Sequence, residues 1–153
     1  MSNLDAYLTM IAISEGTEQI GDRGYNCLVG STPQKPVLFY SYADHPRIKV
    51  RLSPTLTSSA AGRYQILERY YDAYRDQLGL KDFSPGSQDA IALQMIREQH
   101  AFADVAAGRF DVAVAKCANI WASLPGAGYN QHENKLADLR LAFVNAGGVA
   151  IAA

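Results

Sequence analysis

Residues 16–60 limit the possible folds of this chain more than any other segment, because they interrupt an otherwise helical pattern. Residues that favour turns recur throughout the segment, at Gly21, Gly24, Gly30, Pro33, Pro36, Pro46 and Pro54. Short β-prone runs lie between them, at residues 25–29, 37–40 and 48–52. The segment therefore predicts a small antiparallel β-lobe of two or three short strands, placed approximately at residues 20–58.

Helical periodicity occupies both sides of this lobe. Residues 4–13 are apolar on nearly every face, and Ser2 and Asp5 stand at capping-box spacing, so we expect a buried first helix that ends near Gly16. After residue 60 we expect helices at residues 63–78, 85–98, 102–107, 110–121 and 134–146, followed by a frayed tail at residues 149–153. Ser84 and Pro85 suit the N-cap and the first position of a helix. The order of elements predicts a mainly helical α+β fold.

Length and charge exclude several classes of protein. A chain of 153 residues with 48% apolar residues has room for one core, so we expect a single domain over residues 1–153. The net charge of −1 argues against a nucleic-acid binder, because phosphate neutralisation needs a cationic surface. No window approaches the roughly 20 apolar residues that cross a bilayer, and the first residues lack the cationic segment of a signal peptide. We expect cytoplasmic synthesis and no stable membrane insertion.

Glu15 is the first candidate for chemistry, because it follows a very apolar helix and lies at its C-terminal end. The partial negative charge of the helix end and the desolvation by apolar walls both raise the pKa of a carboxyl group. A carboxylic acid that keeps its proton near neutral pH can serve as a general acid. The simpler alternative is a surface glutamate in a turn.

Two further segments carry groups suited to a sugar ligand. In the run Gly62-Arg63-Tyr64-Gln65, the glycine permits close approach and Gln65 offers both a donor and an acceptor. The loop from Leu124 to Gln131 carries Tyr129, whose ring can pack against a sugar, and the amide of Asn130. The simpler alternatives are a turn at a helix start and a connector between helices.

The histidines and cysteines indicate structural roles. His45, His100 and His132 lack the spacing of a zinc motif, so we expect no metal and no cofactor. In Asp44-His45-Pro46 we expect a turn in which the carboxylate bonds the histidine ring. Cys27 and Cys117 lie in apolar runs outside any CxxC pair, which is typical of free, buried thiols.

Several motifs, taken in order along the chain, strongly resemble the bacteriophage lambda endolysin family of lytic murein transglycosylases. They are Ser14-Glu15-Gly16-Thr17, Gly24-Tyr25, Tyr42-Ala43-Asp44-His45-Pro46-Arg47, Ala61-Gly62-Arg63-Tyr64-Gln65, Tyr71-Asp72-Ala73-Tyr74-Arg75, Gln77-Leu78-Gly79-Leu80-Lys81-Asp82-Phe83-Ser84-Pro85 and Asn119-Ile120-Trp121-Ala122-Ser123-Leu124-Pro125-Gly126-Ala127-Gly128-Tyr129. The likeness covers nearly the whole chain.

The resemblance implies a lysozyme-like fold with a glycan-binding groove between a helical lobe and a β-lobe. It implies cleavage of peptidoglycan between N-acetylmuramic acid and N-acetylglucosamine, with formation of a 1,6-anhydro sugar. By motif, Glu15 matches the catalytic glutamate, and Tyr64 and Gln65 match the segment near the scissile sugars. Tyr129, with Asn130 beside it, lies on one of two loops that close over the glycan; the other matches residues 47–57. The Asn130-Gln131-His132 run departs from the lambda-type sequence.

Position 26 departs from the family in an informative way. The lambda-type family can carry Asp here, whereas this chain has Asn26, which cannot act as a base. An active enzyme would then use one carboxyl group, although Asp22 and Asp44 are not excluded as partners for a hydrolytic route. The alternatives left open are a hydrolytic muramidase and a murein-binding module without catalysis.

The resemblance also implies a setting for the protein. We expect a phage or prophage endolysin that acts as a monomer on peptidoglycan glycan strands and causes host cell lysis. Because no signal segment is expected, release to the periplasmic murein would depend on a holin.

Overall fold

The computed structural model describes residues 2–128 and 133–151 of the chain. These residues form two compact units, which meet in the sequence directly after the first helix. We call Met1–Glu15 with Ala92–Ala153 the helical unit, and Gly16–Ile91 the β-containing unit. No helix of the described residues has the length and apolar character needed to cross a membrane. The single domain expected from chain length stays a prediction.

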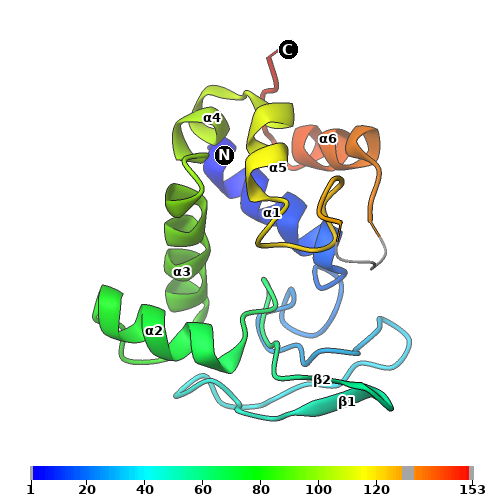
Figure 1. The fold of residues 1–153 in the computed structure, drawn as a ribbon, viewed down its shortest axis with the longest axis vertical. Helices are drawn as coiled ribbons and strands as arrows, with labels where there is room; N and C mark the ends of the chain where they lie inside the picture. Colours follow the sequence, from blue (N-terminus) through cyan, green and yellow to red (C-terminus); the bar gives the residue numbers. More distant parts are fainter. Residues whose placement is uncertain (1, 129–132, 152–153) are drawn as a thin grey trace. The chain divides into compact units, whose positions relative to one another are not determined.

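The helical unit is built around the first helix of the chain. Its helices are α1 (Asn3–Glu15), α4 (Phe102–Ala107), α5 (Phe110–Cys117) and α6 (Leu136–Asn145), joined by the last turns of α3 (Pro85–Glu98). Helix α1, drawn in blue, packs against α6 and α4, and α5 packs against both α4 and α6 (Figure 1). The rings of Tyr7, Phe110 and Phe143 contact one another in its core. The apolar faces of α1 thus have neighbours on several sides.

Both ends of α1 follow the expectation from sequence. The Ser2 hydroxyl accepts a hydrogen bond from the Asp5 backbone N–H at 3.1 Å, and the Asp5 carboxylate accepts one from the Ser2 backbone N–H at 3.4 Å. This is the reciprocal arrangement of a capping box. Gly16 follows the helix with φ of 81°, a conformation that glycine adopts without steric cost. Local sequence features therefore mark where this helix begins and ends.

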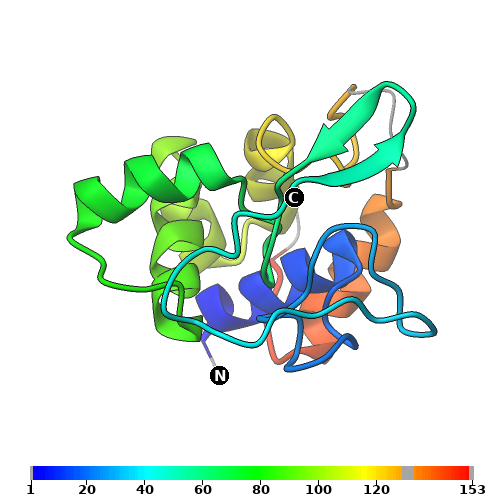
Figure 2. The same cartoon turned by 90° about the horizontal axis from the view of Figure 1, so that it is seen from below.

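The β-containing unit holds a single two-stranded sheet. Strands β1 (Val50–Ser53) and β2 (Leu56–Ser58) form an antiparallel hairpin with an irregular register between Arg51 and Ser53 (Figure 2). The strand predicted at residues 48–52 is confirmed as β1, with a start two residues later. The sequence pattern did not predict β2. The strands expected at residues 25–29 and 37–40 are wrong, because these runs form only isolated bridges, Cys27 with Leu38 and Leu28 with Ala61.

Glycine conformations explain why the run at residues 25–29 does not extend into a strand. Gly24 and Gly30 flank the first run and have φ values of 85° and 82°. Both values lie in the left-handed region, where the backbone turns instead of continuing a ladder. Among the residues of the two runs, Cys27, Leu28 and Phe39 are buried in the core, whereas Val37 is exposed.

The remaining helices differ from expectation mainly at their ends. Helix α2 (Glu68–Leu78) starts five positions later than expected from residues 63–78, because Ala61 and Ile66 pair in a bridge and Gln65 has φ of 53°. Helix α3 has the expected bounds, and the Ser84 hydroxyl accepts a 3.4 Å hydrogen bond from the Ser87 N–H. Helix α5 ends at Cys117 instead of Trp121.

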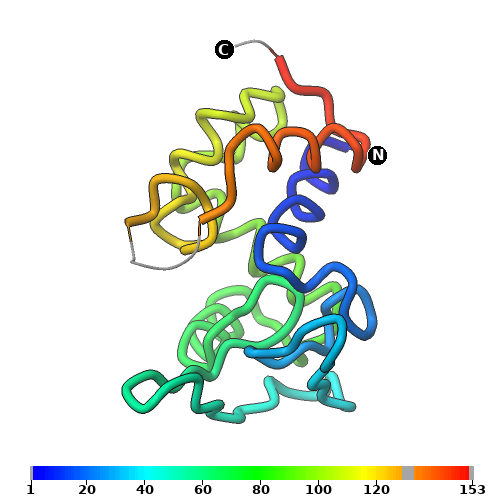
Figure 3. Tube along the Cα trace, turned by 90° about the vertical axis from the view of Figure 1, so that its right-hand side faces the viewer, coloured from blue at the N-terminus to red at the C-terminus, as the bar shows by residue number. Residues whose placement is uncertain are grey.

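The expected frayed tail is held in place as far as Ile151. The Val149 N–H donates to Asn3 Oδ1 at 2.9 Å, and the Ile151 N–H donates to the Gly108 carbonyl at 2.9 Å. Figure 3 shows the red end of the chain returning beside the start of α1. Hydrogen bonds from residues distant in sequence therefore overturn the expectation of fraying for residues 149–151.

Candidate active site

Glu15 is the last residue of α1 and its side chain is half-buried. Its Oε2 atom accepts a hydrogen bond of 2.7 Å from Ser123 Oγ, which follows α5 in the same unit. Burial raises the pKa of the Glu15 carboxyl group, and the Ser123 bond opposes this by favouring the ionised form. For the pKa of Glu15, the effect of desolvation therefore outweighs the effect of the Ser123 hydrogen bond.

Asn134 connects the end of α1 to the segment that carries Ser123. Its Nδ2 donates to the Ser14 carbonyl at 3.0 Å and to Ser14 Oγ at 3.1 Å. Its backbone N–H donates to the Ser123 carbonyl at 2.8 Å. The first of these bonds satisfies a terminal carbonyl of α1, which has no partner within the helix. Asn134 therefore holds the segment of Ser123 beside the end of α1, where Glu15 lies. The sequence analysis gave no role to Ser14, Ser123 or Asn134.

Gln65 and Tyr64 lie together in a turn of the β-containing unit, with different exposure. Gln65 is half-buried, and its Nε2 donates to the Gly62 carbonyl at 2.9 Å. Tyr64 has only 1% of its surface exposed, and its hydroxyl donates to Asp89 Oδ1 at 2.6 Å. A side chain this buried lies beneath the turn, and substrate contact by Tyr64 stays a prediction.

A buried frame of hydrogen bonds holds this turn. Gln88 is completely buried, and its amide donates to the carbonyls of Tyr25 and Phe83 while its Oε1 accepts from the Arg63 N–H. A Cβ added to Gly62 would lie 2.3 Å from Gln88 Oε1, so this position excludes larger residues. Gly62 was predicted to allow close approach to its backbone, and the group that approaches is Gln88.

The carboxylates considered for a hydrolytic route are both hydrogen-bonded elsewhere. Asp22 Oδ2 accepts from the Tyr42 hydroxyl at 2.9 Å, and Asp44 bonds the guanidinium of Arg47. The departure at position 26 also has a structural role, because Asn26 Oδ1 accepts a 2.8 Å bond from the Asp22 N–H. Asn26 closes the turn that begins at Asp22.

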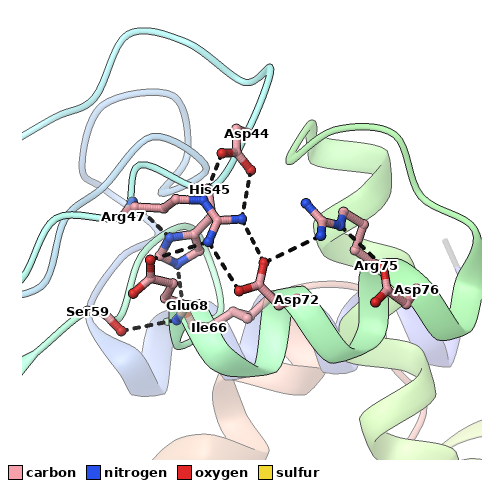
Figure 4. Close-up of polar contacts among 9 residues, drawn as sticks. All are labelled: Asp44, His45, Arg47, Ser59, Ile66, Glu68, Asp72, Arg75 and Asp76. Atoms are coloured by element: carbon pink, nitrogen blue, oxygen red, sulfur yellow. Dashed lines mark hydrogen bonds and ion pairs between the residues drawn. The ribbon is translucent and has the colours of Figure 1, made fainter.

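His45 is structural, as expected, but its partners are different. Asp44 does not bond the histidine ring; instead, His45 Nδ1 accepts from the Arg47 N–H at 3.0 Å and Nε2 faces the Ile66 carbonyl at 2.9 Å. Figure 4 shows these bonds beside Arg47, whose guanidinium binds Asp44, Glu68 and Asp72. The expected turn is therefore wrong in detail, because the guanidinium attracts the Asp44 carboxylate more strongly than a neutral ring does.

Two expected binding residues, Tyr129 and Asn130, lie outside the described residues. Next to them in the sequence, Glu133 accepts hydrogen bonds through its two carboxylate oxygens from the N–H groups of Gly126 and Gly128, at 3.0 and 3.1 Å. These bonds lower the pKa of Glu133.

Cys27 and Cys117 are both buried and free, and no group of three or more metal-ligating side chains occurs in the described residues.

Comparisons with known proteins agree with this architecture. The model of the family described as Endolysin matches residues 5–150. The chain is 52% identical over 147 residues to the endolysin of Escherichia phage lambda, covering 94% of this chain and 90% of that protein. It is 46% identical over 155 residues to the endolysin of Escherichia phage P2, covering 96% of this chain and 94% of that protein.

Solved structures give the same result for the fold. Bacteriophage lambda lysozyme complexed with a chitohexasaccharide matches with a TM-score of 0.92 at 50% identity, over 99% of this chain and 98% of that chain. A second structure of lysozyme from bacteriophage lambda matches with a TM-score of 0.88 at 49% identity, over the same shares of both chains. The mainly helical, lysozyme-like α+β fold is therefore confirmed, and the chain belongs to the endolysin family.

Proposed function

We propose that this endolysin, a peptidoglycan-cleaving enzyme, is a lytic transglycosylase that acts between N-acetylmuramic acid and N-acetylglucosamine. The observation that carries the proposal is the environment of Glu15, a half-buried carboxyl group whose pKa is raised by burial. Within the described residues, its only hydrogen bond comes from a neutral serine. A single acid with no charged partner suits chemistry in which one group gives a proton and then takes one back.

The proposed reaction has two proton transfers through Glu15. In the first, the protonated carboxyl group donates to the glycosidic oxygen, the bond from that oxygen to the anomeric carbon breaks, and positive charge develops on that carbon. In the second, the Glu15 carboxylate takes the proton of the muramyl C6 hydroxyl, whose oxygen then bonds the anomeric carbon. The product is a 1,6-anhydro sugar, and no water is consumed. The substrate's acetamido group can stabilise the intermediate charge.

The partners of Asp22, Asn26 and Asp44 favour this route over hydrolysis. A hydrolytic enzyme of the usual kind needs a second carboxylate as nucleophile or base. Asn26 has no carboxylate, while Asp22 and Asp44 are bonded to Tyr42 and Arg47. Asp44 has both oxygens bonded to the Arg47 guanidinium, so it would have to give up that cation to act as a base.

For substrate binding, we propose that Gln65, Tyr129 and Asn130 contact the glycan. The half-buried amide of Gln65 is fixed to the Gly62 carbonyl through Nε2, which leaves its Oε1 to accept from a sugar hydroxyl or amide. Tyr64 is retained only as a positioning residue beneath this turn. The complex of the lambda relative with a chitohexasaccharide supports a glycan as the ligand.

The phage origin of the relatives supports a role in host lysis. We propose that the protein is made in the host cytoplasm, reaches the periplasmic peptidoglycan through a holin pore, and acts there as a monomer without a cofactor.

Mass analysis of muropeptides tests the reaction type directly. Digestion of purified murein should release products that end in 1,6-anhydro sugars. Products one water heavier, with reducing ends, would identify a hydrolytic muramidase instead. Zymography on a murein gel distinguishes an enzyme from a binding module. Clearing of the gel is expected for the enzyme, whereas binding without clearing would identify a module that lacks catalysis.

A further inference from the structure

A line of hydrogen bonds within the helical unit ends on Glu15. Asn134 Nδ2 lies 3.1 Å from Ser14 Oγ, Ser14 Oγ lies 2.8 Å from Ser123 Oγ, and Ser123 Oγ lies 2.7 Å from Glu15 Oε2. Ser14 is buried, and the other members of the line are half-buried. The line therefore joins three neutral side chains, from three separate segments of sequence, to the proposed acid.

The direction of each bond follows from what the groups can donate. Asn134 must present its NH₂ group to Ser14, because the same atom lies 3.0 Å from the Ser14 carbonyl, which can only accept. Ser14 Oγ therefore accepts from Asn134 and has its own proton for Ser123. Ser123 accepts that proton and has its single proton for Glu15. Each hydroxyl then accepts one bond and donates one, all in the same direction.

The opposite direction leaves a proton without a partner in this line. If Glu15 donated from Oε2, Ser123 would donate to Ser14, and Ser14 Oγ would receive donors from both sides. The Ser14 proton would then have no acceptor among the bonds of this line. The fixed donor at Asn134 thus favours one direction, and Oε2 of Glu15 serves as an acceptor.

We propose that Asn134, Ser14 and Ser123 form an ordered donor chain that keeps the transferable proton of Glu15 on Oε1. This inference rests on the proposed role of Glu15 as the acid and base. Oε1 makes no hydrogen bond within the described residues, so its proton is not engaged by this chain. Asn134, Ser14 and Ser123 act as positioning residues, since they reach the reaction only through Glu15.

With this ordered chain, both proton transfers of the proposed reaction take place at Oε1 of Glu15. Oε1 releases its proton to the glycosidic oxygen, and the same atom accepts the proton from the C6 hydroxyl. Between the two steps, the negative charge on the carboxylate is stabilised at Oε2 by the Ser123 hydroxyl, which needs no reorientation. The chain therefore supports the ionised intermediate without occupying the reactive oxygen.

Titration of Glu15 by carboxyl-carbon NMR tests the chain without substrate. The whole protein is labelled at glutamate side-chain carbons, and a Glu15→Gln variant assigns the signal. Ser123→Ala should raise the pKa of Glu15, because the ionised form loses its donor. Ser14→Ala and Asn134→Ala should raise it less, because they weaken the donor only indirectly. Ser14→Ala combined with Ser123→Ala should match Ser123→Ala alone, since Ser14 acts only through Ser123.

Kinetics of the same variants separate positioning from simple support of the fold. Ser123→Ala should lower kcat on the order of tenfold with little change in KM, and Ser123→Thr should restore most of the rate. Ser87→Ala is the matched control, because that hydroxyl donates to the carboxylate of Asp82 at 2.7 Å in another part of the chain. The Glu15 titration should not move in this control. Asn119→Ala, which removes a 2.9 Å bond to Gln99, is the control for Asn134→Ala.

The possible results lead to separate conclusions. An unchanged Glu15 titration in folded Ser14→Ala and Asn134→Ala proteins, or additive shifts in the double variant, would overturn the ordered chain while leaving the proposed reaction intact. If Ser14→Ala does not fold, Ser14→Cys keeps a side chain of similar size with a weak donor and should show the same upward shift. A fully active Glu15→Gln enzyme would instead overturn the proposed function.

Discussion

The end of α1 and the surroundings of Arg47 are two polar clusters with opposite electrostatic designs. At the end of α1, burial raises the pKa of Glu15, and the side chains bonded to one another there are neutral. Around Arg47, one guanidinium binds three carboxylates, from Asp44, Glu68 and Asp72, and the pKa values of Asp44 and Asp72 are lowered by it (Figure 4). The first environment thus favours the protonated form of Glu15, whereas the second favours the ionised forms of Asp44 and Asp72.

The difference teaches which features of a carboxyl group indicate chemistry. A carboxylate paired with a guanidinium holds its charge through the pH range of most enzymes and is suited to fixing a loop. Arg47 has φ of 56°, and its bonds to Glu68 and Asp72 fasten this unusual backbone to α2. A carboxyl group surrounded by apolar groups and serines has a raised pKa, so it gains and loses its proton closer to neutral pH. We therefore expect reactivity at the carboxyl group that has few charged partners among the described residues.

The largest expected effect is the loss of activity in Glu15→Gln. The amide keeps the size of the side chain and can accept from Ser123, but it cannot give or take the catalytic proton. General acid and base catalysis contributes roughly 10²- to 10⁴-fold, so we expect a loss of at least that size in murein clearing and muropeptide release. Glu98→Gln, at the exposed end of α3, is the matched control and should retain activity.

Sequence reasoning identified Glu15 but not its surroundings, and the reason is distance along the chain. The helix, its capping box and the glycine after it are local patterns, and all were found. The bonds from Ser123 and Asn134 join residues separated by 108 and 120 positions, which no periodicity reveals. The resemblance placed Tyr64 near the substrate, but its burial against Asp89 depends on α3 and could not be read from the turn itself. The strand expected at residues 25–29 failed for a similar reason, because its extension depended on the conformations of Gly24 and Gly30.

A smaller effect is expected when the paired charges around Arg47 are broken. Arg47→Ala leaves three carboxylates without their shared cation, while the alanine must still adopt positive φ. Because these groups are partly exposed, solvent screens them, and we expect a loss of about 1 kcal/mol in the free energy of unfolding, measured by urea denaturation. The loss should shrink in 1 M salt.

Arg69→Ala is the control for this prediction. Arg69 is exposed, lies in the first turn of α2 and forms no ion pair with any described residue, although its guanidinium lies over the Tyr70 ring. Its replacement should change stability by less than that of Arg47, and by an amount that salt does not alter. Equal losses of unfolding free energy in the two variants would show that the ion pairs of Arg47 do not contribute to stability.

The smallest effect concerns the pH dependence of stability at His45, which lies against the Arg47 cluster. Burial lowers the pKa of His45, and the positive charge of Arg47 acts the same way, while the Ile66 carbonyl, Glu68 and Asp44 oppose the shift. The neutral ring fits its site, because Nδ1 accepts from the Arg47 N–H and Nε2–H donates to Ile66. A second proton would place a donor at Nδ1 against the Arg47 N–H.

The sign of the pH effect follows from this lowered pKa. Above about pH 6.5, the ordinary value for histidine, the folded and unfolded states both hold His45 neutral and its contribution is complete. As the pH falls below that value, the unfolded state binds a proton first, so the free energy of unfolding decreases. His45→Phe keeps a ring beside Tyr71 and Phe83 but cannot titrate. The variant should be less stable at pH 7.5, and its deficit relative to the natural protein should narrow between pH 6.5 and pH 5; a deficit that stays constant over that range would show that His45 does not resist protonation in the fold.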